Sequence, residues 1–261
     1  MKRYLIYIVG VLLCSLGTQC VQASVFADST VVYTKAMADS AYAAADYATA
    51  VHIYEQLLAE HGESAAVYYN LGGAYYKMDE IARSILNYER ALLLAPSDAD
   101  TKFNLELARA KAVDKNALVT ELFFARWYRN FTAIMNADAW AKTSILCFII
   151  LISLLVLFIF GKKSKTKKII FIFALLSLLC CVLSGVIASG QAAKLEHREN
   201  AIVMEPSVVV RSTPSANGTE LFILHEGKKV KIKDDSMKAW KEIELEDGNI
   251  GWLPAEAIEK I

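Results

Sequence analysis

The apolar positions of this chain gather in two long uninterrupted stretches. Residues Thr143–Phe160 and Ile169–Gly190 contain no Asp, Glu, Lys, Arg or His and consist mostly of Leu, Ile, Phe, Val, Ala and Ser. A helix of about 20 apolar residues crosses the hydrocarbon core of a bilayer, whereas a surface helix of a soluble protein keeps a polar face. The pattern therefore predicts two transmembrane helices, 143–160 and 169–190, rather than a soluble hairpin buried in a large core.

A basic segment, residues 161–168, joins these stretches and contains five lysines. The outer flanks are poorer in positive charge, with Arg126, Arg129 and Lys142 before the first stretch and Lys194 and Arg198 after the second. Lys and Arg close to the ends of spans are retained in the cytoplasm. We expect a cytoplasmic turn at 161–168, with both long flanks on the outer side of the membrane.

The N-terminus predicts export of the same residues. A basic start at Met1–Arg3 precedes an apolar run, and Val21 and Ala23 place compact residues where signal peptidase cleaves. We expect a signal peptide at 1–23. Attachment as a lipoprotein through Cys20 fits less well, because Gln19 precedes it. An uncleaved anchor would leave the following residues on the same side.

Residues 31–115 carry a repeating helical pattern. Its best copy, residues 65–98, resembles the tetratricopeptide repeat, through Tyr68, Leu71, Gly72, Tyr75, Ser84, Tyr88, Ala91 and Pro96. A shift by one repeat length places Ala50 and Tyr54 in a preceding copy and Phe103 and Leu105 in a following one. The resemblance implies a short all-α tetratricopeptide solenoid of about two and a half repeats.

Function in such an array is expected on its concave surface, where first helices hold an extended peptide or a partner helix. The register places these residues there: Lys35, Asp39, Tyr42, Tyr69, Asn70, Tyr76, Lys77, Phe103, Asn104 and Leu107. We take Lys35, Tyr69, Asn70, Tyr76, Lys77, Phe103 and Asn104 as candidate partner-binding residues. A groove without a dedicated ligand is the alternative.

Some tetratricopeptide domains clamp the carboxylate at the C-terminus of a peptide. Lys35 and Asn70 fall at matching positions, but Asp39, Asp100 and Asn104 occupy the other three. Two acidic side chains would repel the carboxylate of a ligand. A less specific protein-binding groove lined by aromatic side chains is therefore expected instead.

Residues 116–140 are expected to form an amphipathic helix. An apolar stripe runs through Leu118, Leu122, Phe123, Trp127, Phe131 and Ile134 at helical spacing. The stripe could cap the repeats, or it could lie at the membrane interface with Trp127, Tyr128 and Trp140. The sequence leaves both open.

Residues 195–261 are expected to form a small β domain. Its short strands, in which apolar and polar positions alternate, are predicted between Val208 and Leu253, with a hairpin turn at Asp247-Gly248. The segments 210–214, 226–232 and 248–253 resemble the bacterial SH3 family. This resemblance implies a small all-β SH3-like barrel. Domains of this family bind peptidoglycan peptides or proteins in some settings and only complete an architecture in others. Trp240 and Trp252 could stack on a ligand, or they could pack within the barrel.

Charge and cysteine usage exclude several classes of function. The formal net charge of the chain is zero, but both predicted soluble parts are acidic. Residues 31–115 contain 8 Lys or Arg and 12 Asp or Glu, and residues 195–261 contain 9 and 13. Neither part offers the basic surface that nucleic acid needs. All five cysteines lie in the signal segment or the spans, which excludes disulfide frameworks and zinc–cysteine sites outside the membrane. No catalytic motif is present and the four histidines lack metal-ligand spacing, so we expect no enzyme, cofactor or metal.

Together these parts predict a multidomain membrane protein. Their order resembles the tetratricopeptide and SH3 family encoded in Bacteroides aerotolerance (Bat) operons. The resemblance implies a bacterial inner-membrane protein acting beside von Willebrand factor A-type membrane proteins and a MoxR-type ATPase. We expect a non-enzymatic interaction scaffold facing the periplasm, serving aerotolerance or the response to envelope stress. The alternative is an envelope tether that binds peptidoglycan peptide through residues 195–261.

Overall fold

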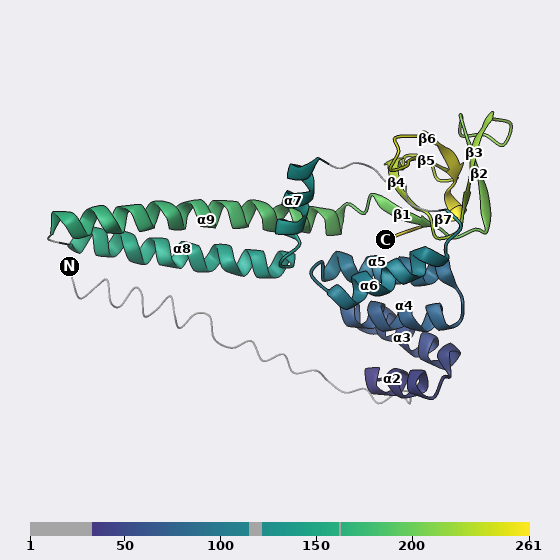
Figure 1. Ribbon diagram of the computed structural model, residues 1–261, viewed down its shortest axis with the longest axis horizontal. Helices are drawn as coiled ribbons and strands as arrows, with labels where there is room; N and C mark the ends of the chain where they lie inside the picture. The colour runs from purple at the N-terminus through teal and green to yellow at the C-terminus, as the bar shows by residue number, and fades with distance from the viewer. Residues whose placement is uncertain (1–32, 115–121, 162) are drawn as a thin grey trace. The chain divides into compact units, whose positions relative to one another are not determined.

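The computed structural model describes residues 33–114, 122–161 and 163–261. These residues form a helical array, a pair of long helices and a C-terminal antiparallel sheet (Figure 1). The expected order of an α-helical region, two long apolar helices and a β region is confirmed. The predicted signal segment, residues 1–23, and residues 116–121 of the predicted amphipathic helix lie outside the described residues.

The helical array consists of α2 to α6, and each helix packs against the next one along the chain. Polar side chains cap three of the helix starts: Thr34 accepts from the N–H of Met37, and Asp46 and Asp98 act in the same way for α3 and α6. The helices are α2 (Lys35–Ala43), α3 (Tyr47–His61), α4 (Ala65–Lys77), α5 (Ile81–Leu94) and α6 (Ala99–Lys111).

The backbone of the array repeats with the period predicted from the sequence. The number of residues between the starts of α3 and α5 is the same as the number between the starts of α4 and α6. The turns within the two helical hairpins also match. Ala45, between α2 and α3, and Asp79, between α4 and α5, are separated by this same number of residues and have left-handed φ values of 61° and 63°. Two successive helical hairpins therefore share one turn geometry.

Small residues allow the close helix contacts of the array. A Cβ atom at Gly72 would lie 2.9 Å from the ring of Tyr88, so only glycine fits between α4 and α5 at this point. The hydroxyl of the buried Ser84 donates to the carbonyl oxygen of Gly72 at 2.8 Å. Glycine and serine at these two positions of the repeat pattern bring the two backbones together.

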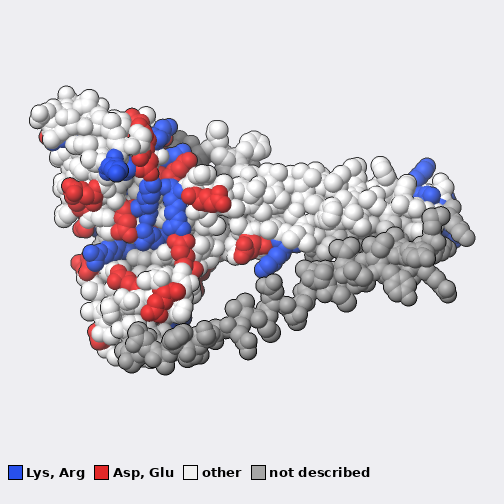
Figure 2. Space-filling model, turned by 180° about the vertical axis from the view of Figure 1, so that it is seen from behind, with Lys and Arg blue, Asp and Glu red and all other residues white. Residues whose placement is uncertain are grey.

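The helix pair consists of α8 (Ala137–Phe160) and α9 (Ser164–Glu196), both long and apolar enough to span a membrane. Serine hydroxyls join the two helices: Ser144 donates to the carbonyl oxygen of Cys181 at 2.9 Å, and Ser177 to that of Cys147 at 2.7 Å. Figure 2 shows a broad face of the pair without Lys, Arg, Asp or Glu, between charged residues at its two ends. Such hydrogen bonds between small polar residues are typical of helix packing in membranes.

Both ends of α9 differ from the predicted boundaries. Residues 164–168 are helical, so the turn between the long helices is shorter than the predicted segment 161–168. Residues 191–196 lie beyond the predicted span 169–190 but continue the helix to Glu196. This segment consists of Gln, Ala, Lys, Leu and Glu, which all favour helix, and it contains no residue that would end one.

The C-terminal sheet has its strands in the order β3-β2-β6-β5-β4-β1-β7, and all described neighbours are antiparallel. The predicted hairpin turn is confirmed: Gly248 joins β5 to β6 with a φ of 86°, which glycine adopts without strain. The strands are β1 (Asn200–Val203), β2 (Ser207–Arg211), β3 (Glu220–His225), β4 (Lys229–Asp234), β5 (Trp240–Glu244), β6 (Ile250–Pro254) and β7 (Ile258–Lys260).

Strand β1, which was not predicted, is buried on both of its faces. Ala201 and Val203 belong to the apolar core of the sheet. Ile202 points the opposite way and joins a second core with Ile85 and Leu105 of the helical array. The last residue, Ile261, belongs to this second core as well. The sheet thus packs directly on α5 and α6, at a contact that we call the junction.

A buried carboxylate lies within the junction. Glu89 of α5 is 7% exposed and pairs with Arg109 of α6 and, at 2.8 Å, with Lys229 of β4. Burial opposes ionisation of this carboxyl, but the attraction of Lys229 and Arg109 outweighs it and lowers the pKa of Glu89. At the edge of the junction Arg90 forms an ion pair with Glu259 at 2.9 Å.

Helix α7 (Phe123–Thr132) occupies part of the predicted amphipathic segment and has no buried residue. It therefore does not provide an apolar cap for the array. Instead, the sheet covers α5 and α6 through Ile202 and Ile261. The predicted helix over 116–140 is also interrupted, because α8 begins separately at Ala137. Asn136 caps that start by accepting a hydrogen bond from the N–H of Ala139.

Glu89→Gln is expected to weaken the junction strongly. The substitution leaves Arg109 and Lys229 without their buried anion, and breaking a buried pair from one side costs about 3–5 kcal/mol. Hydrogen exchange of amides in α5 and β1 should accelerate in the purified full chain. Glu106→Gln is the matched control, because Glu106 pairs with the same Arg109 but is exposed and should contribute less than about 0.5 kcal/mol. Equal protection in both variants would contradict this role for Glu89.

Candidate functional site

The first helices of the array, α2, α4 and α6, border a hollow of about 560 Å³ that we call the groove. Five tyrosines give it a largely aromatic lining, and one acidic and one basic side chain lie among them. The lining residues are Asp39, Tyr42, Tyr54, Tyr69, Asn70, Gly73, Tyr76, Lys77, Tyr88, Asn104 and Leu107.

The groove brings together five of the seven predicted partner-binding residues: Tyr69, Asn70, Tyr76, Lys77 and Asn104. The other two, Lys35 and Phe103, do not line the hollow itself. Lys35 on α2 forms an ion pair with Asp39 at 2.7 Å. Phe103 lies one helical turn before the lining residue Leu107 on α6 and is 65% exposed. Phe103 therefore extends the groove at its rim.

Asp39 is the acceptor for three neighbouring side chains. Its Oδ1 accepts from the Tyr54 hydroxyl at 2.6 Å and from the Asn70 amide at 3.0 Å, while Lys35 binds Oδ2. Partial burial would raise the pKa of this carboxyl, but the bonds from Lys35 and Tyr54 outweigh burial and lower it. Lys35 and Asn70 are the two residues that match a peptide-carboxylate clamp. Both already bind the carboxylate of Asp39 and so are not free to bind that of a peptide.

Burial keeps three tyrosine hydroxyls of the groove, those of Tyr42, Tyr54 and Tyr88, in the neutral form. Burial raises the pKa of Tyr54, and its hydrogen bond to the Asp39 carboxylate raises it further. Burial is also the main cause of the raised pKa values of Tyr42 and Tyr88. These phenols can therefore serve as hydrogen-bond donors and acceptors over the physiological pH range.

Side chains from different helices hold the remaining rings in place. The amide of Asn104 on α6 donates to the Tyr69 hydroxyl on α4 at 3.0 Å. The Lys111 ammonium lies 4.4 Å from the centre of the Tyr76 ring, in a cation–π arrangement. The Tyr69 and Tyr88 rings are 6.0 Å apart. The groove is therefore built before any ligand arrives, which reduces the entropy lost on binding.

Two lining residues, Tyr54 and Tyr88, were assigned to the repeat pattern but not to the concave surface. They come from the second helices α3 and α5 and are almost fully buried, at 1% and 3% exposure. Both also reach the floor of the groove. Their positions in the repeat pattern gave no signal of this second role, because the pattern identifies a buried ring without showing which surface its edge reaches.

The candidate residues of the sheet, Trp240 and Trp252, lie on one face of the β5–β6 hairpin. The register pairs Trp240 with Pro254 and Glu242 with Trp252, so both indoles share a face opposite the core residue Ile243. Both are half-buried and lie outside the buried core of the sheet. The two rings are therefore surface residues rather than core packing.

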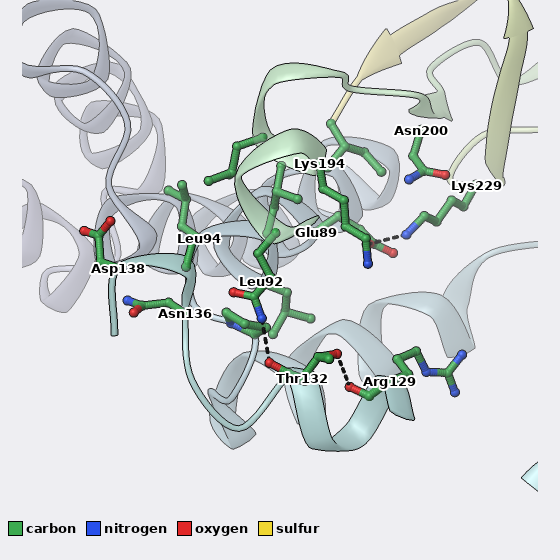
Figure 3. Close-up of a pocket in the computed structure, with 17 residues that line it drawn as sticks. Glu89, Leu92, Leu94, Arg129, Thr132, Asn136, Asp138, Lys194, Asn200 and Lys229 are labelled. Atoms are coloured by element: carbon green, nitrogen blue, oxygen red, sulfur yellow. Dashed lines mark hydrogen bonds and ion pairs between the residues drawn. The ribbon is translucent and has the colours of Figure 1, made fainter. Parts of the chain in front are cut away.

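A second hollow, of about 420 Å³, lies beside the junction and is shown in Figure 3. We call it the junction hollow. Its apolar wall comes from Leu92 and Leu94 at the end of α5, and charged side chains close it: Glu89, Arg129, Asp138, Lys194 and Lys229. Glu89 and Lys229 are paired with each other. The junction hollow thus lies between the array, the sheet, α7 and the helix pair.

No group of His, Cys, Asp and Glu that could hold a metal ion occurs among the described residues. No protein-family model matches the chain. The curated proteins contain no significant match to it either. The chemistry of the groove and of the junction therefore carries the functional argument.

Asp39→Asn is expected to destabilise the array modestly. The side chain is 43% exposed, so its ion pair with Lys35 contributes little. The weakened bonds from Tyr54 and Asn70 should cost about 1 kcal/mol in the free energy of unfolding. Denaturant unfolding of the purified chain, followed by tyrosine fluorescence, measures the difference. Asp100→Asn, at an exposed position of α6, should change the result by less than about 0.5 kcal/mol. Equal effects would show that Asp39 does not organise the groove.

Proposed function

We propose that this protein is a membrane-anchored, non-enzymatic scaffold whose groove holds a segment of a partner protein. The observation that carries this proposal is the exposed apolar pair Phe103 and Leu107, at 65% and 41%, beside a tyrosine-lined hollow. Exposed apolar side chains next to a preformed aromatic hollow are typical of protein-binding surfaces. In this proposal the array is a short tetratricopeptide solenoid and the sheet is an SH3-like domain.

The lining of the groove indicates the kind of segment that it would accept. Neutral phenols and the amides of Asn70 and Asn104 suit the backbone groups of an extended peptide or the polar side chains of a helix. Phe103 and Leu107 suit one or two apolar anchors. A peptide carboxylate fits poorly, because Asp39 already occupies the cation and amide that would bind it. We therefore favour an internal segment of a partner over a free C-terminus.

The helix pair supports membrane anchoring. Its most apolar stretches are not covered by the rest of the described chain: only Trp140 and Leu151 are buried in α8, and α9 buries four small or apolar residues. Lys163 is the N-cap residue of α9, and Lys165, Lys167 and Lys168 lie in its first turns, where α8 and α9 are joined. This positive charge favours the cytoplasmic side for that end of the pair. The array and the sheet would then both lie in the periplasm.

The junction supports an even number of crossings between the array and the sheet. Glu89 precedes the helix pair in the chain and Lys229 follows it, yet the two side chains are bonded at 2.8 Å. Their segments must therefore lie on the same side of a membrane. Two spans, α8 and α9, meet this requirement.

The resemblance to the Bat-operon family suggests the cellular setting of this scaffold. Von Willebrand factor A-type membrane proteins of the same gene cluster are the partners that we propose, in an accessory role in aerotolerance or envelope stress. The groove and the membrane anchor are the features of the chain that support this setting. The alternative, an envelope tether, is supported by Trp240 and Trp252, which share one face of the sheet.

A photoreactive residue at Lys77 is expected to capture one defined membrane protein in intact cells. Lys77 lines the groove but is exposed, so replacing it removes no packing. Phe103→Ala combined with Leu107→Ala should lower capture about tenfold, since a few apolar anchors carry most of the energy of an interface. Mass spectrometry of the crosslinked band measures both results.

The matched control is the same photoreactive residue at Arg83, an exposed position whose hollow shares no residue with the groove. Equal capture from Lys77 and Arg83 would contradict a groove-directed scaffold. Trp240→Ala combined with Trp252→Ala tests the tether, through retention of the full chain on purified peptidoglycan. Removing the whole sheet would be a poor test, because it would also uncover Ile85 and Leu105 at the junction.

Cysteine labelling is expected to place both soluble parts on the outer side. In a chain whose native cysteines are Ser, a cysteine at Glu60 or Asn217 should react with an impermeant maleimide on spheroplasts. A cysteine at Lys165 should react only after the membrane is permeabilised, because the lysine-rich turn is cytoplasmic. Labelling of Lys165→Cys and Glu60→Cys under the same condition would rule out the proposed topology.

A further inference from the structure

Helix α7 carries an exposed aromatic face. Its aromatic residues fall on one side of the helix, and their exposure ranges from 38% for Phe131 to 79% for Phe124: Phe123, Phe124, Trp127, Tyr128 and Phe131. Arg126 and Arg129 lie on the opposite side. A contiguous aromatic patch of this size is seldom left in water, so it marks a surface that something else covers.

Hydrogen bonds fix the end of α7 to the helix pair. The side-chain amide of Gln191 donates to the carbonyl oxygens of Thr132 and Met135, at 2.5 Å and 3.1 Å. The indole N–H of Trp140 donates to the Thr132 carbonyl oxygen at 3.1 Å. Figure 3 shows the bond to Thr132 within the junction hollow. These bonds fix the position of α7 along the two long helices.

That position is the end of both apolar stretches. Gln191 directly follows Gly190, where the apolar stretch of α9 ends. Trp140 lies three residues before Thr143, where the apolar stretch of α8 begins. If the helix pair spans a membrane, α7 therefore lies at the boundary between hydrocarbon and headgroups.

The two faces of α7 have different neighbours. On the polar face, Arg129 lines the junction hollow together with Lys194 and Lys229, and is thus turned toward the soluble parts. On the aromatic face, Phe131 stacks on Trp127 at 5.5 Å and contacts the Trp140 ring at 5.6 Å. The aromatic face is therefore turned toward the start of α8.

We infer that α7 is an interfacial helix whose aromatic face is covered by the lipids of the outer leaflet. This inference rests on the proposed membrane anchoring and adds a second, lateral contact with the same bilayer. Trp and Tyr prefer the headgroup boundary, and helices with an aromatic face opposite a basic one lie in that plane. Continuity with the lipid-facing surface of the helix pair favours lipid over a second copy or a partner protein. The contact fixes the groove of the array at a constant height above the membrane.

Fluorescence quenching in bilayers tests the position of Trp127. The full chain carrying Trp240→Phe and Trp252→Phe keeps Trp127 and the structural Trp140, and a further Trp127→Phe variant isolates the contribution of Trp127. Both are reconstituted in vesicles of phosphatidylethanolamine and phosphatidylglycerol that contain brominated lipid. Emission due to Trp127 should fall about twofold with bromine near the headgroups, and less with bromine near the chain ends, as expected of an indole at the interface. Aqueous acrylamide should have little effect.

Two outcomes would overturn the inference. Strong quenching of Trp127 by acrylamide would place α7 in water. Protection from both acrylamide and brominated lipid would mean that protein, such as a second copy, covers the aromatic face. Leu155→Trp, added to the variant that lacks Trp127, controls for the membrane itself, because Leu155 is an exposed residue within the apolar stretch of α8. If that indole is quenched by deep bromine while Trp127 is not, only the inference about α7 fails. If neither is quenched, membrane anchoring fails as well.

Discussion

The buried carboxylate of Glu89 is the interaction on which the arrangement of the soluble parts depends. It bonds to Arg109 of the neighbouring helix and to Lys229 of the sheet. An ionised carboxylate is stable in such a buried place only with its cations present, so the sheet cannot move away from α5 without a large cost. Ile202 and Ile261 surround this contact with apolar packing. The chain thus leaves the array, passes through the helix pair and returns to bind the array again.

This return also explains how a short helical array remains complete. Within the described residues, its last helix, α6, has no further helix of the array packed against it. The sheet covers one face of α6 and leaves another face open. Leu105 and Ala108 pack in the junction, while Asn104 and Leu107 line the groove. The sheet therefore stabilises the array without closing the surface that we propose for partner binding. In the proposed scaffold, this packing joins the groove and the sheet on the same side of the membrane.

Much of this organisation could be predicted from the sequence, because it depends on local periodicity. The two apolar stretches, the helical repeat and the Asp247-Gly248 turn all appear in the structure close to their predicted places. Five of the seven predicted partner-binding residues line the groove, since a repeat places equivalent residues on equivalent faces. Helix ends were predicted less well: the second span was expected to end at Gly190, where the apolar residues end, but the polar residues Gln191–Glu196 continue the helix.

The sequence alone determined which segments become helices or strands and which positions on them face a core, because backbone geometry imposes spacings that are visible in the order of residues. Only the tertiary structure decided which of those faces meet. Glu89 and Lys229 are 140 residues apart, and nothing local to either one indicates the other. The same holds for Asp39 and two of its hydrogen-bond donors, Tyr54 and Asn70, which come from two other helices. Strand β1 shows the reason most directly. The strand is too short to display a recognisable alternation of apolar and polar residues, and both of its faces become buried only when the sheet and the array pack together.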